Sequence, residues 1–224
     1  MHDNDLKIAI CGAPGAGKTA LAKALSSKLT IPLIYQGTKE LRATVGDIKK
    51  MPPFWRMNEI QRAMYQLNLI NYRMDIESKY DSFVADGCAI DLLTWFRMCS
   101  WLIPLDQKTA TMKALQGLMG IYTHIVYLPS WDSAESPKNS EEELYAVDPF
   151  NALTADYITK GIVSFLMHAG KLVYVVTTPP FMISHSSDVD NVQLAVDTRV
   201  DEVLKYVLST STALDTQNSS VSVQ

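Results

Sequence analysis

A short stretch near the start of the chain has a residue spacing that suits one kind of chemistry. Residues 12–19 read GAPGAGKT, which matches the pattern G-x-x-x-x-G-K-[ST] at every fixed position. Glycines permit backbone torsions that other residues resist, so consecutive N–H groups can turn toward one anion. Lys18 adds a cation that can reach the end of a phosphate chain, and the Thr19 hydroxyl suits Mg2+. We therefore predict that residues 12–19, the phosphate loop, bind the phosphates of a nucleotide.

The sequence on either side supplies the context that this loop needs. Residues 6–11 form a short, mostly apolar run typical of a buried parallel strand, and residues 18–29 repeat apolar side chains with helical spacing. A helix N-terminus directly after the loop adds a partial charge that favours an anion. The residues predicted to contact the nucleotide are Gly12, Ala13, Gly15, Ala16, Gly17, Lys18, Thr19 and Ala20.

A carboxylate follows a second apolar run. Residues 82–85 form a predicted strand that ends at Asp86. Beside a phosphate loop, this position suits a group that holds the Mg2+ shell or accepts a proton from the attacking group. We predict Thr19 and Asp86 as metal-binding residues, and Lys18 and Asp86 as catalytic residues. Asp91 is predicted to be a favourable charge at a helix N-terminus, without a catalytic role.

Two polar residues follow the predicted strand at residues 31–35. Gln36 lies just past this strand, where its amide could bond the base or sugar of a substrate; an ordinary turn residue is the alternative. Arg42 lies on a short predicted helix at residues 38–45. Its guanidinium could form paired hydrogen bonds to a phosphate, and a solvated helix arginine is the alternative.

Strands and helices alternate along the chain, which predicts an α/β fold with a five-stranded, mainly parallel sheet flanked by helices. The phosphate loop, Gln36 and Asp86 each follow a strand, so we expect them to meet at the carboxyl edge of the sheet. The remaining predicted strands and helices are residues 124–128 and 172–177, and residues 59–80, 90–102, 106–119, 151–168 and 189–208.

Two further segments differ in composition from these elements. Residues 129–149 are polar, acidic and flanked by prolines, and this length predicts a lid-like loop rather than a plain connection. Residues 209–224 are rich in Ser and Thr without periodicity, so a disordered tail is predicted there. Residues 1–208 are expected to form one domain.

The bulk composition narrows the class of protein. The chain has 224 residues, of which 47% are hydrophobic and 20% charged, as in one globular domain. The net charge of -4 gives no sign of the basic face of a duplex-DNA binder. Three cysteines fit neither a zinc site nor a disulfide framework, and no apolar stretch is long enough to span a membrane. We therefore expect a cytoplasmic protein with buried free thiols.

Two segments resemble known kinases. Residues 35–45 resemble the adenylate kinases, in which the second strand leads through a Gly-containing turn to a short helix bearing L-R-A-x-V. Asp86 and Gly87 resemble the start of D-G-x-P-R in the same family, and Asp86 also resembles the start of D-R-x-x-x-D in small phage and bacterial P-loop kinases. The resemblance covers residues 6–178 and is most specific at the phosphate loop.

The resemblance implies a single-domain P-loop NTPase fold with ATP and Mg2+ as cofactors. It implies that Arg42 grips the phosphate of the acceptor. It also implies that the helix at residues 59–80 walls the acceptor pocket, where Gln61 could contact a base; aromatic residues on that helix are more typical of a core. The resemblance leaves a homodimer open.

The sequence departs from this family in its arginines. No arginine directly follows Asp86, and none lies between Arg97 and Arg199, so the lid candidate lacks the arginines that neutralise the moving phosphoryl group in adenylate kinases. Arg97 is the candidate to supply the missing charge. Arg42 and Arg97 therefore complete the predicted catalytic set.

Together these features predict ATP-Mg-dependent phosphoryl transfer to a nucleotide, nucleoside or related acceptor, similar to a deoxynucleoside monophosphate kinase. The alternative is a nucleotide-dependent ATPase or switch that acts on a protein partner, which an arginine-poor acidic lid would suit. Two further versions are a kinase of a modified base in DNA, against which the acidic charge argues, and a degenerate kinase retained for binding.

Overall fold

The computed structural model of the protein describes residues 5–35, 48, 50–53, 56–99, 103–130, 149–179 and 189–221. Three predicted features lie outside these residues. They are Gln36, the short helix with Arg42, and residues 131–148 of the lid candidate.

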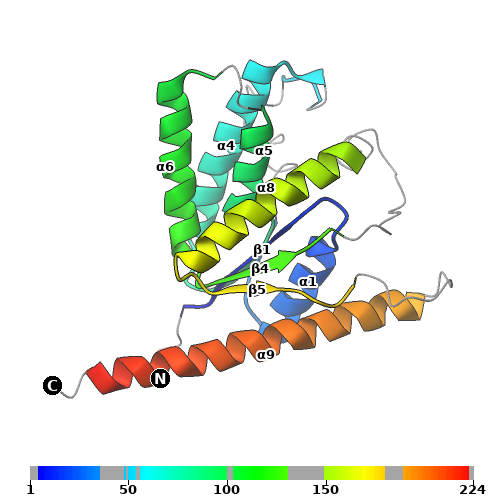
Figure 1. The fold of residues 1–224 in the computed structure, drawn as a ribbon, viewed down its shortest axis with the longest axis vertical. Helices are drawn as coiled ribbons and strands as arrows, with labels where there is room; N and C mark the ends of the chain where they lie inside the picture. Colours follow the sequence, from blue (N-terminus) through cyan, green and yellow to red (C-terminus); the bar gives the residue numbers. More distant parts are fainter. Residues whose placement is uncertain are drawn as a thin grey trace.

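A parallel sheet forms the centre of the described structure (Figure 1). It has five strands in the order β2-β3-β1-β4-β5, and every neighbouring pair is parallel. The predicted α/β fold class is therefore confirmed. The strands are β1 (Lys7–Gly12), β2 (Leu33–Ile34), β3 (Phe83–Asp86), β4 (His124–Leu128) and β5 (Val173–Val175).

Helices cover both faces of this sheet because the side chains of each strand alternate between two apolar clusters. In β1, Ile8 and Ile10 belong to the cluster with α1 and α9, whereas Ala9 and Cys11 belong to the cluster with α4, α5, α6 and α8 (Figure 1). Both faces of the sheet are buried, as the unbroken apolar runs predict. The helices are α1 (Lys18–Leu29), α4 (Glu59–Glu77), α5 (Ala89–Cys99), α6 (Leu105–Ile121), α8 (Pro149–His168) and α9 (Val189–Val221).

The last helix differs from the sequence-based expectation. α9 continues to Val221, although its apolar periodicity ends near Leu208 and a disordered tail was expected from Ser209. The Thr210 hydroxyl bonds the carbonyl of Tyr206 within the helix, and it lies 2.9 Å from Nε2 of His124 at the start of β4. This tie joins the helix to the sheet through residues that are far apart in the sequence. None of the helices in the described ranges is long and apolar enough to cross a membrane.

β1 and β4 approach each other very closely where β1 ends. Gly12 has a φ of +149°, and a Cβ added there would lie 2.2 Å from the carbonyl oxygen of Leu128. Because that oxygen belongs to a buried central strand, it has no room to move aside. Glycine is therefore required at this position by both conformation and space.

We predict that Gly12→Ala lowers the free energy of unfolding by more than about 2 kcal/mol, through backbone strain and overpacking. Gly117→Ala is the matched control because a Cβ there meets nothing within 4 Å on α6. It should stabilise the protein by about 0.5–1 kcal/mol, as alanine does in a helix. Urea denaturation of both variants measures the difference, and equal stabilities would contradict the prediction.

Candidate active site

The phosphate loop joins the central strand β1 to the first turn of α1. Gly15 and Gly17 have φ values of +80° and +88°, which side chains other than glycine rarely adopt. Gly17 occupies the position before the first residue of α1, so the free N–H groups of the helix begin at the loop. The loop therefore has the backbone conformation that the sequence motif predicts for an anion site.

The ammonium group of Lys18 lies over this loop. Its Nζ donates hydrogen bonds to the carbonyl oxygens of Gly12, at 2.7 Å, and Ala13, at 3.0 Å. These two bonds fix a positive charge at the entrance of the loop. An ammonium has three donors, so one remains for a phosphate oxygen.

The two predicted metal-binding residues are in contact. The Thr19 hydroxyl donates to Oδ2 of Asp86 at 2.7 Å. β1 and β3 are neighbours, and Asp86 pairs in register with Ile10, two residues before the loop begins. The carboxyl ends of these parallel strands therefore bring Asp86 to the first turn of α1, as predicted.

Asp91 has a larger role than the sequence indicates. It lies in the first turn of α5, as predicted, but it is only 4% exposed and accepts two backbone hydrogen bonds. Oδ1 accepts from the Gly12 N–H at 3.1 Å, and Oδ2 accepts from the Cys88 N–H at 2.8 Å. Burial raises the pKa of Asp91, and Lys18 and these two N–H groups oppose that rise. Asp91 thus joins the start of the phosphate loop to the turn after β3.

Arg73 on α4 holds the ends of β2 and β3 together. It is 1% exposed and donates to the carbonyl oxygen of Gly87 at 2.8 Å, to that of Tyr35 and to the carboxylate of Glu77. Burial alone would lower the pKa of Arg73, but neighbouring groups, with Glu77 foremost, raise it above its ordinary value. No role for Arg73 was predicted from the sequence. The spacing of Arg73 and Glu77, four residues apart on one helix face, was the available signal.

Gln61 is engaged in a helix cap. Its Oε1 accepts the Asn58 N–H at 3.0 Å, and its own N–H donates to Oδ1 of Asn58 at 2.9 Å. This capping box starts α4. The carboxamide oxygen of Gln61 therefore has a structural partner, which leaves its NH2 group for any substrate contact.

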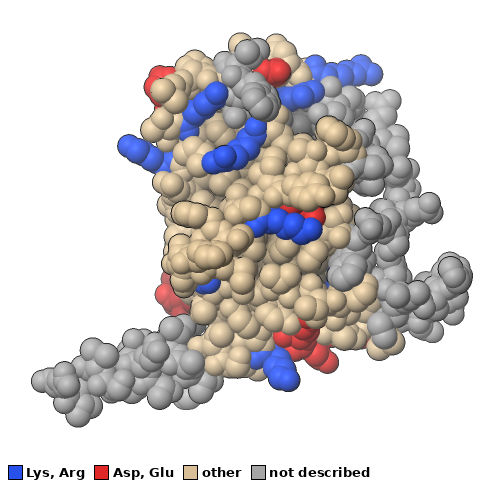
Figure 2. Space-filling model, viewed as in Figure 1, with Lys and Arg blue, Asp and Glu red and all other residues tan. Residues whose placement is uncertain are grey.

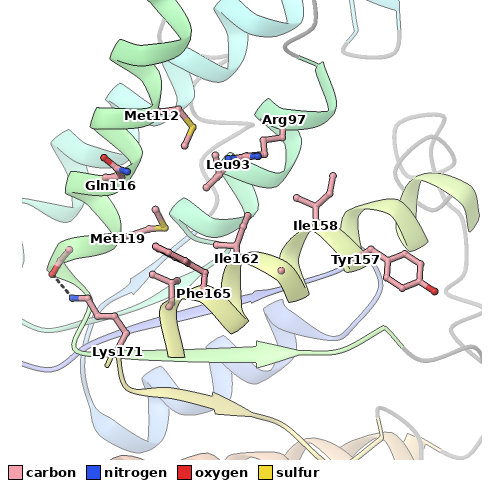
Figure 3. Close-up of a pocket in the computed structure, with 13 residues that line it drawn as sticks. Leu93, Arg97, Met112, Gln116, Met119, Tyr157, Ile158, Ile162, Phe165 and Lys171 are labelled. Atoms are coloured by element: carbon pink, nitrogen blue, oxygen red, sulfur yellow. Dashed lines mark hydrogen bonds between the residues drawn. The ribbon is translucent and has the colours of Figure 1, made fainter. Parts of the chain in front are cut away.

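Arg97 does not join the phosphate loop. It lies eight residues beyond the start of α5, which is about 12 Å along a helix axis. Its side chain lines a groove of about 720 Å3 between α5, α6 and α8, beside Leu93 and across from Met112 (Figure 3). The start of α5, and not its end, faces the loop, because Asp91 is bonded to Gly12 there. The predicted catalytic role of Arg97 is not supported by this placement.

Comparisons with known proteins show what the fold resembles. No family model and no curated protein match the sequence. A deoxyadenosine kinase from M. mycoides, solved with dCMP and dCDP, aligns with 92% of this chain and all of its own, at 14% identity and a TM-score of 0.62. The same enzyme with dCTP gives 15% identity, 91% and 100% coverage, and a TM-score of 0.62. The NadR protein with NR gives 11% identity, 89% and 50% coverage, and a TM-score of 0.58. These likenesses confirm the predicted α/β fold, with its five-stranded parallel sheet flanked by helices.

We predict that Asp91→Asn destabilises the protein by about 1–3 kcal/mol, because an amide has one acceptor oxygen for two buried N–H groups. Asp81→Asn, at an exposed position, is the control and should change little. Hydrogen exchange at the Gly12 amide should also accelerate in Asp91→Asn. An unchanged exchange rate at Gly12 would show that Asp91 does not anchor the loop.

Proposed function

We propose that the protein transfers a phosphoryl group from ATP-Mg to a small nucleoside or nucleotide. The observation that carries this proposal is the contact of Thr19 with Asp86 directly beside the Lys18 ammonium. A hydroxyl and a carboxylate thus meet at the first turn of α1, and the ammonium of the preceding residue is bonded to carbonyls of the phosphate loop. This is the set of groups that phosphoryl transfer requires, because the reaction depends on positioning and charge stabilisation.

The residues at this loop fit Mg2+. Thr19 and Asp86 offer two hard oxygen donors, and Mg2+ in nucleotide sites takes one or two protein ligands together with phosphate oxygens and water. Within the described ranges, no group of three or more His, Cys, Asp or Glu residues could hold a metal. The pair of Thr19 and Asp86 therefore suits a metal that arrives with its nucleotide. When bound, Mg2+ neutralises charge on the phosphates.

Each residue of the site then has a defined part. The loop N–H groups and Lys18 bind the phosphates and stabilise the charge that shifts during transfer. Thr19 and Asp86 hold the Mg2+ shell, and Asp86 also orients the acceptor hydroxyl at the edge of the sheet. Arg42 binds the phosphate of an acceptor that carries one.

The acceptor class is inferred from chemistry and from fold. A deoxyadenosine kinase that was solved with nucleotides has a similar fold over nearly the whole chain, which supports a nucleoside or nucleotide acceptor. Gln36, which follows the end of β2 by two residues in the sequence, is the residue proposed to bond its base or sugar. Gln61 is proposed to offer its NH2 group to a base. A deoxynucleoside monophosphate is the specific acceptor we propose to test first.

A second candidate function is an ATPase or switch that acts on a protein partner. The absence of any arginine between Arg97 and Arg199 favours it, since the lid candidate brings no cation of this kind to the phosphates. A modified base in DNA is a weaker acceptor. On the face shown in Figure 2, most Lys and Arg side chains of the described residues lie toward one end, and the others are isolated on a mainly uncharged surface. A duplex binder would carry a continuous basic band.

We predict that ADP forms from ATP-Mg only when an acceptor is present. Lys18→Ala and Asp86→Asn should each lower kcat by a factor of about 100 or more, because each removes a group that stabilises or positions the moving phosphoryl group. Lys23→Ala removes a cation from an exposed position on the same helix and should retain full activity. A coupled ADP assay over nucleosides, nucleoside monophosphates and oligonucleotides measures this.

Rapid ATP hydrolysis without an acceptor would contradict the kinase proposal and favour the switch. ATP binding that depends on Lys18, without turnover for any acceptor, would favour a protein retained for binding alone.

A further inference from the structure

We propose that Arg199 is a positioning residue that couples two parts of the donor site, the phosphate loop and the loop after β5 (residues 176–179). The proposal rests on the proposed function in taking ATP as the donor. In a parallel α/β sheet, the nucleotide lies along the carboxyl ends of neighbouring strands. β1 carries the phosphate loop, and β4 and β5 follow it in the sheet. The loop after β5 is therefore placed to meet the donor beyond its phosphates.

Arg199 donates hydrogen bonds to both loops from the side of the sheet that α9 covers. It lies on α9, is 3% exposed, and is 183 residues away from the phosphate loop in sequence. Its Nη1 donates to the carbonyl oxygen of Ala16 at 3.0 Å, and its Nε donates to that of Thr178 at 2.9 Å. One planar guanidinium thus fixes the separation of the two backbone segments.

The phosphate loop has the shape that lets Arg199 approach. A Cβ added at Gly17 would lie 2.9 Å from Nη1 of Arg199. A side chain at this position would push the guanidinium away from Ala16. Gly17 therefore serves the arginine as well as the turn of the loop.

Glu202, one turn further along α9, holds the second loop. Its Oε1 accepts from the Thr177 N–H at 2.8 Å, from the Thr177 hydroxyl at 2.6 Å and from the Tyr174 hydroxyl at 2.7 Å. Burial alone would raise the pKa of Glu202, but the Thr177 and Tyr174 hydrogen bonds lower it to about 2. The carboxylate is therefore charged at every working pH, and the loop after β5 is held at two consecutive residues.

The arginine also carries charge that the described residues leave partly uncompensated. Its Nη2 is buried and has no hydrogen-bond partner among the residues that the structure describes. Burial lowers the pKa of Arg199, and the Glu202 carboxylate opposes this only in part. A nucleoside triphosphate bound at the phosphate loop, across the backbone of Ala16 from Arg199, supplies the missing negative charge. Nucleotide binding therefore favours the charged form of Arg199, and the charged form favours nucleotide binding.

Two consequences separate this role from a purely structural one. The charge of Arg199 attracts any polyphosphate at the phosphate loop. Its pair of hydrogen bonds matters only for a ligand that touches both loops, because such a ligand gains from their fixed separation. Inorganic tripolyphosphate reaches the phosphate loop alone, whereas ATP reaches both.

The experiment measures Kd for ATP-Mg and for tripolyphosphate-Mg by calorimetry. Arg199→Ala should weaken ATP at least tenfold and tripolyphosphate clearly less, so that the preference for ATP falls. Arg199→Lys keeps the charge but not the two-pronged bond, and it should recover tripolyphosphate affinity without recovering the ATP preference. Lys205→Ala, an exposed cation on the same helix, should match the wild type.

An equal loss for both ligands in Arg199→Ala, or unchanged ATP affinity, would overturn the proposal. If Arg199→Ala does not fold, Glu202→Gln provides the second test, since releasing Thr177 should lower the ATP preference in the same way. Wild-type protein that binds no ATP, or binds it equally in Lys18→Ala, would overturn the proposed function and this inference together. ATP binding that needs Lys18 but not Arg199 would overturn this inference alone.

Discussion

The structure depends on one point of convergence, the end of the central strand at Gly12. Its N–H is bonded to Asp91, its carbonyl oxygen accepts from Lys18, and its Cα lies against the carbonyl of Leu128. Three elements, α5, α1 and β4, are thereby fixed to a single residue without a side chain. A parallel sheet brings strand ends to one edge, but that edge has unpaired backbone groups. Here those groups are bonded to the side chains that build the site.

Buried charged side chains next to the site also form hydrogen bonds to backbone groups at the strand ends. Arg73 and Arg199 are each almost fully buried, and each donates to two or more backbone carbonyls at strand ends or loops. Burying a charge costs free energy unless it is paired and hydrogen-bonded, and Glu77 and Glu202 lie within reach of these arginines. Buried charged groups of this kind add little to the free energy of unfolding by themselves. They fix the relative positions of backbone segments, which apolar contacts could not hold in register.

Features that depend on residues close together in the sequence were predicted, whereas contacts between residues far apart in the sequence were missed. The phosphate loop follows from its own residues, and the contact of Thr19 with Asp86 follows from the alternation of strands and helices. Arg199 was missed because its partners are backbone carbonyls far along the chain, which no spacing rule identifies. For Arg73, the spacing to Glu77 indicates the ion pair but not the carbonyls of Tyr35 and Gly87. Arg97 lies in the groove between α5, α6 and α8, and its catalytic role stays a prediction, since the sequence shows a missing charge but not which end of α5 faces the site. Gln61 was assigned from resemblance, and its helix cap could have been read from Asn58 three residues before it.

The arginines of this chain bear on how the charge of the moving phosphoryl group is neutralised. Arg73 and Arg199 do not replace lid arginines, because both are almost fully buried and donate to backbone carbonyls on the protein side of the loops. Among the described residues at the phosphate loop, Lys18 is then the cation that can touch a phosphate directly. Under the proposed function, Arg199 acts on the phosphates through the low-dielectric backbone of Ala16, with a charge that is fixed before the nucleotide arrives. The site would then use a preorganised charge below the loop where the adenylate kinases use lid arginines. Such a charge binds ground state and transition state more nearly alike and favours affinity over rate.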